Sequence, residues 1–194
     1  MGGFSFEDVH SLIIFSCDLL AQGEKMESEE RNSQMDLKST EAFLQKRIGS
    51  DFHFVDHRGE RIPFHQLGKP ISQGKISLIS SGGFYLASQE PFDTEALLGD
   101  LTYRVIPNTV TLGDLSIAHT HYKHQYVLAD LNCAFPIELL RQLEAEGTIG
   151  EFSKSVYSFN GYLLDILGIE KQLAVQIARE LKENQVDAVI LAPV

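Results

Sequence analysis

The sequence predicts an α/β fold: a mostly parallel sheet with flanking helices, preceded by a helical and β-hairpin N-terminal extension. Two observations predict the sheet. Residues 76–79 and 187–191 are short, mainly apolar runs, a pattern typical of strands that are buried on both faces of a parallel sheet. Helical patterns lie between the strand-like runs, and this alternation implies that helices cover both faces.

The first 22 residues carry a helical pattern. Ser5 followed by Asp8 makes a capping box at the start of this segment. Apolar residues then recur at helical spacing, at Val9, Leu12, Ile13, Leu19 and Leu20. We expect the helix to end before a polar linker over residues 24–39.

Residues 40–67 complete the expected extension. A short helix over residues 40–48 is expected to end at Gly49. Residues 52–64 place two strand-like runs on either side of the letters DHRG, which indicates a β-hairpin. Pro63 restricts the second of these strands to a sheet edge, because proline lacks the N–H that a central strand needs.

Residues 68–194 carry the remaining elements, which we assign to a single α/β domain. Strands are expected over residues 76–79, 103–106, 115–118 and 187–191. A helix is expected from Pro136 to Glu146, because proline suits the first helical turn, and Gly147 follows it. A second helix is expected over residues 170–183, which carry a regular apolar stripe.

Composition and charge exclude several classes of protein. The 194 residues include 16 Lys and Arg against 27 Asp and Glu, a net charge of −11, which argues against binding to nucleic acid or an anionic membrane. No apolar stretch approaches the length of a membrane helix, and no basic leader precedes Glu7, so we expect a cytoplasmic protein. Cys17 and Cys133 lie far apart and have no metal-binding spacing, which fits a reducing compartment.

A glycine pair follows the first strand of the domain. Residues 80–83 read SSGG, and a pair of glycines lets the backbone approach a ligand closely. The first interpretation is a plain tight turn. The second is a site at which the N–H groups of Gly82 and Gly83 bind an anion, although neither a dinucleotide fingerprint nor a phosphate-loop lysine is present.

Three of the seven histidines lie within residues 119–124. The spacing of His119, His121 and His124 resembles the HxHxDH motif of metallo-β-lactamase-fold hydrolases, and histidine is the commonest metal ligand. Lys123 stands where that motif has its aspartate, and no further histidine follows His124. We therefore expect no metal site, and interpret the stretch as a polar loop or as a hydrogen-bonding site for an anionic substrate.

Arg104 and Cys133 are further candidates for chemistry. Arg104 lies inside an apolar strand, where its charge must be paired. The structural interpretation pairs it with Asp100 or Asp114, and the functional one makes it a clamp for a substrate carboxylate. Cys133 is interpreted as a small buried hydrophobic residue, with a nucleophile as the alternative.

From residue 68 onward, a series of motifs resembles the selenoprotein B family of glycine, sarcosine, betaine and D-proline reductases. The matching blocks are residues 69–72, 76–83, 90–93, 99–107, 118–122, 130–132, 135–136, 143–150, 158–162 and 186–194. Their order and spacing are specific, although no single block is. Residues 1–67 do not match and are expected to be an added segment.

The resemblance implies a Rossmann-like domain that takes part in reductive cleavage of a C–N bond in a small amino acid or betaine, with a dithiol as electron donor. It implies partner subunits, one of which carries a pyruvoyl group that activates the substrate amino group. It also implies a role in substrate binding or selenolate support for Arg104, His119, His121 and Asn132, to which we add Gly82 and Gly83.

In this family the strand that ends like residues 192–194 leads into the catalytic selenocysteine, or a cysteine in its place. We therefore expect the catalytic residue immediately after Val194, and expect these residues to be an inactive N-terminal part of a longer selenoprotein. Such a truncated chain would expose an apolar sheet edge and form homo-oligomers. The alternatives are a non-enzymatic domain that binds a small molecule or a partner, and a metal-dependent hydrolase that uses the three histidines.

Overall fold

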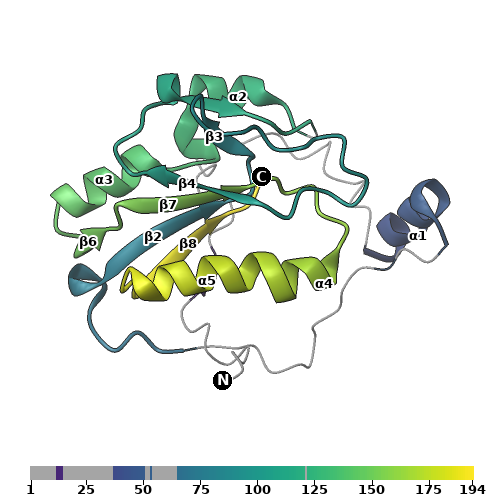
Figure 1. The fold of residues 1–194 in the computed structure, drawn as a ribbon. Helices are drawn as coiled ribbons and strands as arrows, with labels where there is room; N and C mark the ends of the chain where they lie inside the picture. The colour runs from purple at the N-terminus through teal and green to yellow at the C-terminus, as the bar shows by residue number, and fades with distance from the viewer. Residues whose placement is uncertain (1–11, 15–36, 51–52, 54–64, 121) are drawn as a thin grey trace, which may run out of the picture. The chain divides into compact units, whose positions relative to one another are not determined.

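The structure is a computed structural model, and it describes residues 12–14, 37–50, 53, 65–120 and 122–194 (Figure 1). Its contacts divide the chain into two units, one of residues 1–19 and 64–194 and one of residues 20–63. The smaller unit holds α1 (Leu37–Ile48). This helix begins three residues before the predicted start and ends, as predicted, before Gly49.

A mixed sheet forms the centre of the larger unit. Its strands lie in the order β1–β8–β2–β7–β4, and β6 pairs with β2 outside this path. Their bounds are Leu12–Ile14 for β1, Lys75–Ser80 for β2, Tyr103–Pro107 for β4, Glu151–Phe152 for β6, Ser155–Phe159 for β7 and Ala188–Ala192 for β8. Every pairing is parallel except that of β4 with β7. The predicted α/β class and the strands near residues 76, 103 and 187 are therefore confirmed.

A small second sheet stands apart from the central one. It pairs β3 (Phe84–Leu86) with β5 (Leu115–Ile117) in antiparallel fashion. The strand predicted over residues 115–118 therefore forms, but it does not join the main sheet.

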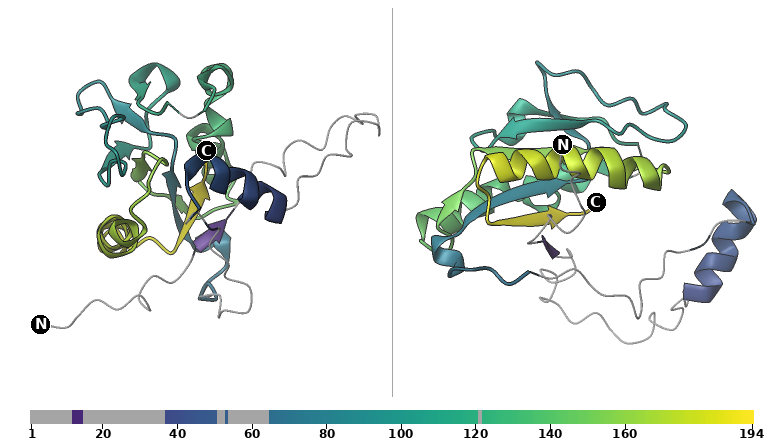
Figure 2. Two further views of the ribbon diagram at one scale, coloured as in Figure 1. Left: turned by 90° about the vertical axis from the view of Figure 1, so that its right-hand side faces the viewer. Right: turned by 60° about the horizontal axis from the view of Figure 1, so that its bottom comes forward.

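Helices cover both faces of the central sheet, as predicted (Figure 2). The helical bounds are His124–Ala129 for α2, Ile137–Ala145 for α3, Ile166–Gly168 for α4 and Ala174–Glu183 for α5. Short 3₁₀ helices span Ile71–Gln73, Leu112–Asp114 and Leu131–Cys133. A short π-helix, Ile169–Leu173, joins α4 to α5. Pro136 precedes α3 and Gly147, with φ +72°, follows it, as the sequence predicts.

The alternation of side chains along β2 builds the two cores. Ile76 and Leu78 face the layer that contains α3 and the β3–β5 sheet. Ile79 faces the opposite layer, where it packs with Ile177 and Leu181 of α5. Because β2 is buried from Ile76 to Ser80, its sequence there is mainly apolar and carries no charge.

The helix predicted over residues 1–22 is wrong at residues 12–14, which form β1. This strand pairs in parallel with β8, and Leu12 lies beside Val189. Three apolar residues can form their backbone hydrogen bonds at a sheet edge as well as in a helix. Pairing with β8 therefore overrides the helical spacing of the local sequence. The rest of that helix, the linker over residues 24–36 and, apart from His53, the hairpin over residues 52–64 lie outside the described residues.

Candidate functional site

The carboxyl ends of β2, β7 and β8 lie together at one edge of the sheet, which we call the carboxyl edge (Figure 1). The chain passes from β2 to β7 on one side and later to β8 on the other. This arrangement is a topological switch point, the place at which open α/β sheets bind ligands. The loop after β2, residues 81–83, lies directly at this point.

Gly82 and Gly83 form a closely packed turn at the carboxyl edge. Gly83 has φ +69°, and a Cβ atom built on it would lie 2.7 Å from the carbonyl oxygen of Ala118. The N–H of Gly82 donates to Ser80 Oγ at 3.1 Å, and the N–H of Gly83 donates to the carbonyl of Phe159 at 2.9 Å. Because both amides have acceptors within the protein, these contacts favour the tight-turn interpretation over an anion cradle.

Three buried polar side chains hold this turn in place. Ser80 Oγ donates to the carbonyl of Ala134 at 2.8 Å, and Ser158 Oγ accepts the N–H of Phe84 at 2.8 Å. The side chain of Asn160 donates to the carbonyl of Ala118 at 3.1 Å. Sequence reasoning assigned no role to Ser80, Ser158 or Asn160. The signal that marks them is a polar residue at the buried end of an otherwise apolar strand.

The histidine stretch packs against the glycine turn through Tyr122. The phenol of Tyr122 donates to the carbonyl of Gly82 at 2.9 Å. Its ring lies between two imidazoles, with centroids 4.8 Å from His119 and 4.8 Å from His124. Burial raises the pKa of Tyr122 to about 12, with a further contribution from the negative charge that Cys133 carries when it is ionised, so the phenol stays protonated at neutral pH.

The candidate metal ligands, His119, His121 and His124, do not form a described cluster. His119 is buried, and His124 Nε2 lies 2.6 Å from the backbone carbonyl of His119. That contact commits one ring nitrogen of His124 to the backbone. His121 lies outside the described residues. Among the residues that the structure describes, no three His, Cys, Asp or Glu side chains are grouped so as to hold a metal ion.

Arg104 lies on β4 beside Ser158 of β7 and is held by backbone carbonyls. Its Nε donates to the carbonyl of Glu90 at 2.8 Å, its Nη2 to that of Pro91 at 3.2 Å, and its Nη1 to Thr102 Oγ1 at 2.8 Å. The guanidinium also stacks over the ring of Phe92, 4.2 Å from its centroid.

Neither carboxylate that sequence reasoning paired with Arg104 forms an ion pair with it. Asp100 is linked to Arg104 by hydrogen bonds through Thr102, whose hydroxyl donates to Asp100 Oδ1 at 2.5 Å, and the nearby guanidinium also helps to lower the pKa of Asp100. Asp114 instead accepts the N–H and hydroxyl of Thr111. Carbonyl oxygens therefore supply the partners that a half-buried arginine needs.

Asn132 and Cys133 follow α2 in the turn that leads to α3. The side chain of Asn132 donates to Asp130 and accepts the N–H of Leu139 at 3.2 Å, so it fixes the start of α3. Cys133 is exposed, which corrects the expectation that it is buried. The short turn Leu131–Cys133 directs Leu131 and Ala134 into the core and leaves the Cys133 side chain outside.

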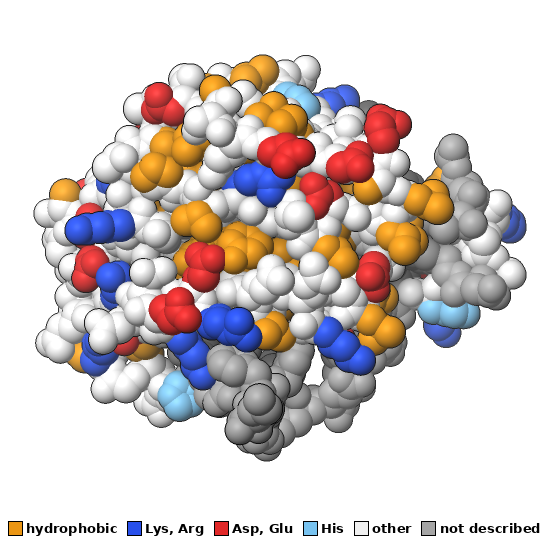
Figure 3. Space-filling view, viewed as in Figure 1, with side chains coloured by type: hydrophobic (Ala, Val, Ile, Leu, Met, Phe, Trp, Pro, Cys, Tyr) orange, Lys and Arg blue, Asp and Glu red, His pale blue; other side chains and the backbone are white. Residues whose placement is uncertain are grey.

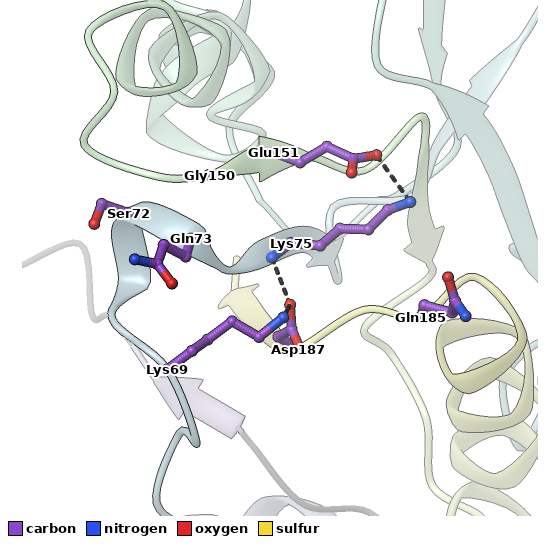
Figure 4. A pocket seen from close by; sticks show the side chains of 8 residues that line it. All are labelled: Lys69, Ser72, Gln73, Lys75, Gly150, Glu151, Gln185 and Asp187. Atoms are coloured by element: carbon purple, nitrogen blue, oxygen red, sulfur yellow. Dashed lines mark hydrogen bonds and ion pairs between the residues drawn. The ribbon is translucent and has the colours of Figure 1, made fainter.

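The opposite end of the sheet, which we call the amino edge, carries a polar pocket of about 590 Å³ (Figure 4). Lys69 pairs with Asp187 at 2.8 Å, and Lys75 pairs with Glu151 at 2.9 Å. The backbone N–H of Lys75 also donates to Asp187, at 2.7 Å. The two lysines and two carboxylates are thus paired with one another. These ion pairs join neighbouring parts of the sheet.

Comparison with known proteins identifies relatives of the chain. The family model for glycine/sarcosine/betaine reductase selenoprotein B matches residues 38–194. D-proline reductase subunit gamma of Acetoanaerobium sticklandii is 32% identical over 123 residues, which are 63% of this chain and 50% of the relative. Glycine reductase complex component B subunit gamma of Symbiobacterium thermophilum is 31% identical over 141 residues, 68% of this chain and 31% of the relative.

A sarcosine reductase complex component B subunit beta from Peptoclostridium acidaminophilum is 28% identical over 138 residues, 68% of this chain and 30% of the relative. The chain thus spans half or less of the length of these relatives. No solved structure matches it. Within the described ranges, no helix has the length and apolar character needed to cross a membrane.

Proposed function

The chain belongs to the glycine/sarcosine/betaine reductase selenoprotein B family, and from this premise we propose that it forms part of a reductase component. The proposed reaction is reductive cleavage of a C–N bond in a small amino acid or betaine, with a dithiol as electron donor. The match of the family model to residues 38–194 carries the proposal. Relatives named as D-proline, glycine and sarcosine reductase subunits support it.

We propose that the catalytic selenocysteine, or a cysteine in its place, follows Val194. The N–H of Val194 donates to Ser81 Oγ at 2.9 Å, and the N–H of Ser81 donates to the carbonyl of Ala192 at 3.2 Å. The strand β8 therefore ends at the switch point, where a reactive residue is best placed. A selenolate supplies a nucleophile that is ionised at neutral pH, and the Ser81 hydroxyl retains its proton for an anion beside it. Residues 1–194 alone are expected to show no turnover.

The six sequence-predicted binding residues divide into two proposed roles. We propose that His119 and His121 contact the substrate or the selenolate, and that the turn at Gly82 and Gly83, whose amides already bond within the protein, shapes the carboxyl edge beside them. We propose that Arg104 and Asn132 position the surrounding loops, because their polar atoms already bond to Glu90, Pro91, Asp130 and Leu139. A pyruvoyl group, where the reaction requires one, is proposed to come from a separate subunit.

Two broader proposals accompany this function. The parallel strands β2, β7 and β8, with helices on both faces, support a Rossmann-like description of residues 68–194. The strand β1 lies in the same sheet and the family match begins at residue 38, so we propose that the segment before residue 68 is partly built into this domain. We also propose a cytoplasmic location, because a selenolate that is restored by dithiols requires a reducing compartment.

The test is the nucleotide sequence that follows the Val194 codon. We expect a UGA codon for selenocysteine, or UGU or UGC for cysteine, followed by an open frame that encodes further α/β pattern and a downstream cysteine. The full-length protein with selenocysteine should then reduce glycine, sarcosine, betaine or D-proline in the presence of dithiothreitol and its partner subunits, and the selenocysteine-to-alanine variant should not. A UAA or UAG codon, or UGA without a frame beyond it, contradicts the proposal and favours a binding domain.

A further inference from the structure

Five large apolar side chains gather on the surface of the larger unit. We call Leu97, Leu98, Leu164, Ile166 and Leu167 the leucine patch. Leu97 is 85% exposed and Leu167 is 61% exposed, and the other three are each more than half exposed. Single exposed leucines are ordinary, but a contiguous apolar patch on a protein surface marks an interaction site.

The backbone fixes these side chains in their exposed positions. The two segments that carry the patch, residues 96–101 and 162–168, are joined by a hydrogen bond from the N–H of Leu164 to the carbonyl of Leu98 at 3.0 Å. Gly99 has φ +87° and lies so close to the carbonyl of Tyr162 that it has no room for a side chain. Such packing prevents the leucines from turning inward without rebuilding both segments.

Carboxylates lie among these leucines. Residues 93–101 and 162–170 contain five acidic residues and no Lys, Arg or His. The carboxylates are Asp93, Glu95, Asp100, Asp165 and Glu170. Figure 3 shows hydrophobic side chains beside acidic ones on the right-hand side of the molecule, over the loop before β4 and near α4. The patch therefore has an apolar centre and an acidic rim.

Hydrogen bonds hold part of this rim in place. Asp165 Oδ1 accepts the N–H of Gly168 at 2.9 Å, and Asp100 accepts the N–H of Asp93 at 2.9 Å. Burial tends to raise the pKa of Asp100, but its bonds from the Thr102 hydroxyl and from backbone N–H groups outweigh this and lower the pKa. Asp100 therefore remains negative at neutral pH.

The leucine patch adjoins the carboxyl edge. Residues 162–168 continue directly from Gly161, whose N–H donates to the carbonyl of Ser81 at 2.9 Å. Residues 96–101 lead directly into β4 and Arg104. A protein that covers the patch would therefore also border the loops of the candidate site.

We propose that the leucine patch docks a different protein chain, one that presents an apolar strip rimmed by Lys and Arg. Burial of the exposed leucines supplies the affinity, and the acidic rim selects a basic partner. A second copy of this chain is the poorer occupant, because each copy carries a net charge of −11 and the same acidic rim. The proposal goes beyond the reductase function and does not depend on it.

The test uses a defined probe, a fluorescent amphipathic helical peptide of Leu and Lys at helical spacing, titrated with the purified chain and followed by anisotropy. We expect binding that weakens with added salt. We expect the double variant Leu97→Ser/Leu167→Ser to bind about tenfold or more weakly. The matched control is Leu128→Ser, which changes an exposed leucine on α2 and should leave binding unchanged. A peptide of Leu and Glu should not bind.

Two further measurements make each outcome decisive. Hydrogen exchange of the unaltered chain should slow in residues 96–101 and 162–168 when the Leu–Lys peptide is added, whether or not the double variant folds. Sedimentation velocity should show the same oligomeric state for the unaltered chain and for the double variant. Equal binding by the double variant and by Leu128→Ser, no binding at all, or self-association that the double variant abolishes would each overturn the proposal.

Discussion

The carboxyl edge and the amino edge of the central sheet are held together by different kinds of interaction. At the carboxyl edge, Ser80, Ser158 and Asn160 are each at most 4% exposed and bond to backbone groups. At the amino edge, the charged side chains of Lys69 and Glu151 are 43% and 50% exposed and form ion pairs. Buried neutral hydrogen bonds are costly to break, whereas exposed ion pairs contribute little. The polar pocket of the amino edge is therefore not the better functional site, and we expect the carboxyl edge to be the more rigid of the two.

The largest expected effect is that of Gly83→Ala. The substitution forces a side chain onto a backbone with φ +69° and brings its Cβ to 2.7 Å from the carbonyl of Ala118. We expect the free energy of unfolding to fall by about 3 kcal/mol in urea titration, from backbone strain and steric overlap together.

Gly147→Ala is the matched control for that substitution. Gly147 has a similar φ, +72°, but has nothing within 4 Å of its Cβ position. Its cost should be about 1 kcal/mol, from backbone strain alone. Equal costs for the two variants would mean that the glycine turn can move away from Ala118, and would contradict the rigidity of the carboxyl edge.

The second effect is that of Asn160→Ala. This variant leaves the partly buried carbonyl of Ala118 and N–H of Tyr162 without the partner that the buried Asn160 side chain supplies. We expect a loss of about 2 kcal/mol in the free energy of unfolding, measured by urea titration. Asn132→Ala, whose hydrogen bonds are exposed, should lose less than about 1 kcal/mol. The reverse order would show that the turn before α3 matters more than the switch point.

Local patterns predict β2 and β8 and also the more exposed β4 and β5, but they miss the buried β7 and the strand β1. The apolar runs around Leu78 and Val189 are visible in the sequence because both faces of β2 and β8 are covered. The strand β1 was not predicted, because its conformation depends on pairing with β8, which lies far away in the sequence. The antiparallel direction of β4 and the separate β3–β5 sheet likewise depend on contacts that no local periodicity encodes.

The candidate site shows the same limit. The glycine turn and the strand end before it are local features, and the sequence predicts both. The partners of Arg104 are not predictable in this way, because they are backbone carbonyls at Glu90 and Pro91. Asn160 was missed for the same reason, since its acceptor at Ala118 lies 42 residues away.

A third and smaller effect concerns Tyr122, which joins the histidine stretch to the glycine turn. Tyr122→Phe removes the bond to the carbonyl of Gly82 and should cost about 1 kcal/mol at neutral pH. The pKa of Tyr122 is about 12 in the folded protein, against an ordinary tyrosine value of 10.0. The unfolded chain therefore loses this proton first, so the stability that Tyr122 contributes is intact below pH 10 and is lost as the pH rises toward 12.

Urea midpoints below and above pH 10 measure this dependence. The unaltered protein should lose stability more steeply than Tyr122→Phe across that range. Tyr103→Phe is the control, because the pKa of Tyr103 is also raised to about 12, by burial and by its bond to Glu180, away from the histidine stretch. Each variant should remove its own share of the slope. If Tyr122→Phe loses stability with rising pH as steeply as the unaltered protein, then solvent reaches the phenol of Tyr122 in the unaltered protein.

The smallest effect is expected at the amino edge, for Lys69→Met. The methionine keeps the apolar stem but removes the ion pair with Asp187, which keeps its bond from the N–H of Lys75. Burial tends to raise the pKa of Asp187, but the hydrogen bond from Lys69 and that from the Lys75 N–H outweigh it and lower the pKa. The resulting stability is present above pH 3.8, the ordinary pKa of an aspartate, and is lost as the pH falls below it.

We expect Lys69→Met to cost less than about 0.5 kcal/mol near neutral pH, because the pair is partly exposed. The difference from the unaltered protein should shrink further with added salt and with acidification below pH 3.8. Urea titration at two salt concentrations measures both trends. If Lys69→Met costs as much as Asn160→Ala and does not respond to salt, then the ion pairs of the amino edge stabilise the sheet as strongly as the buried amide of the carboxyl edge. The rigidity that distinguishes the carboxyl edge would then be a property of the whole sheet, and burial would no longer mark one edge as the functional one.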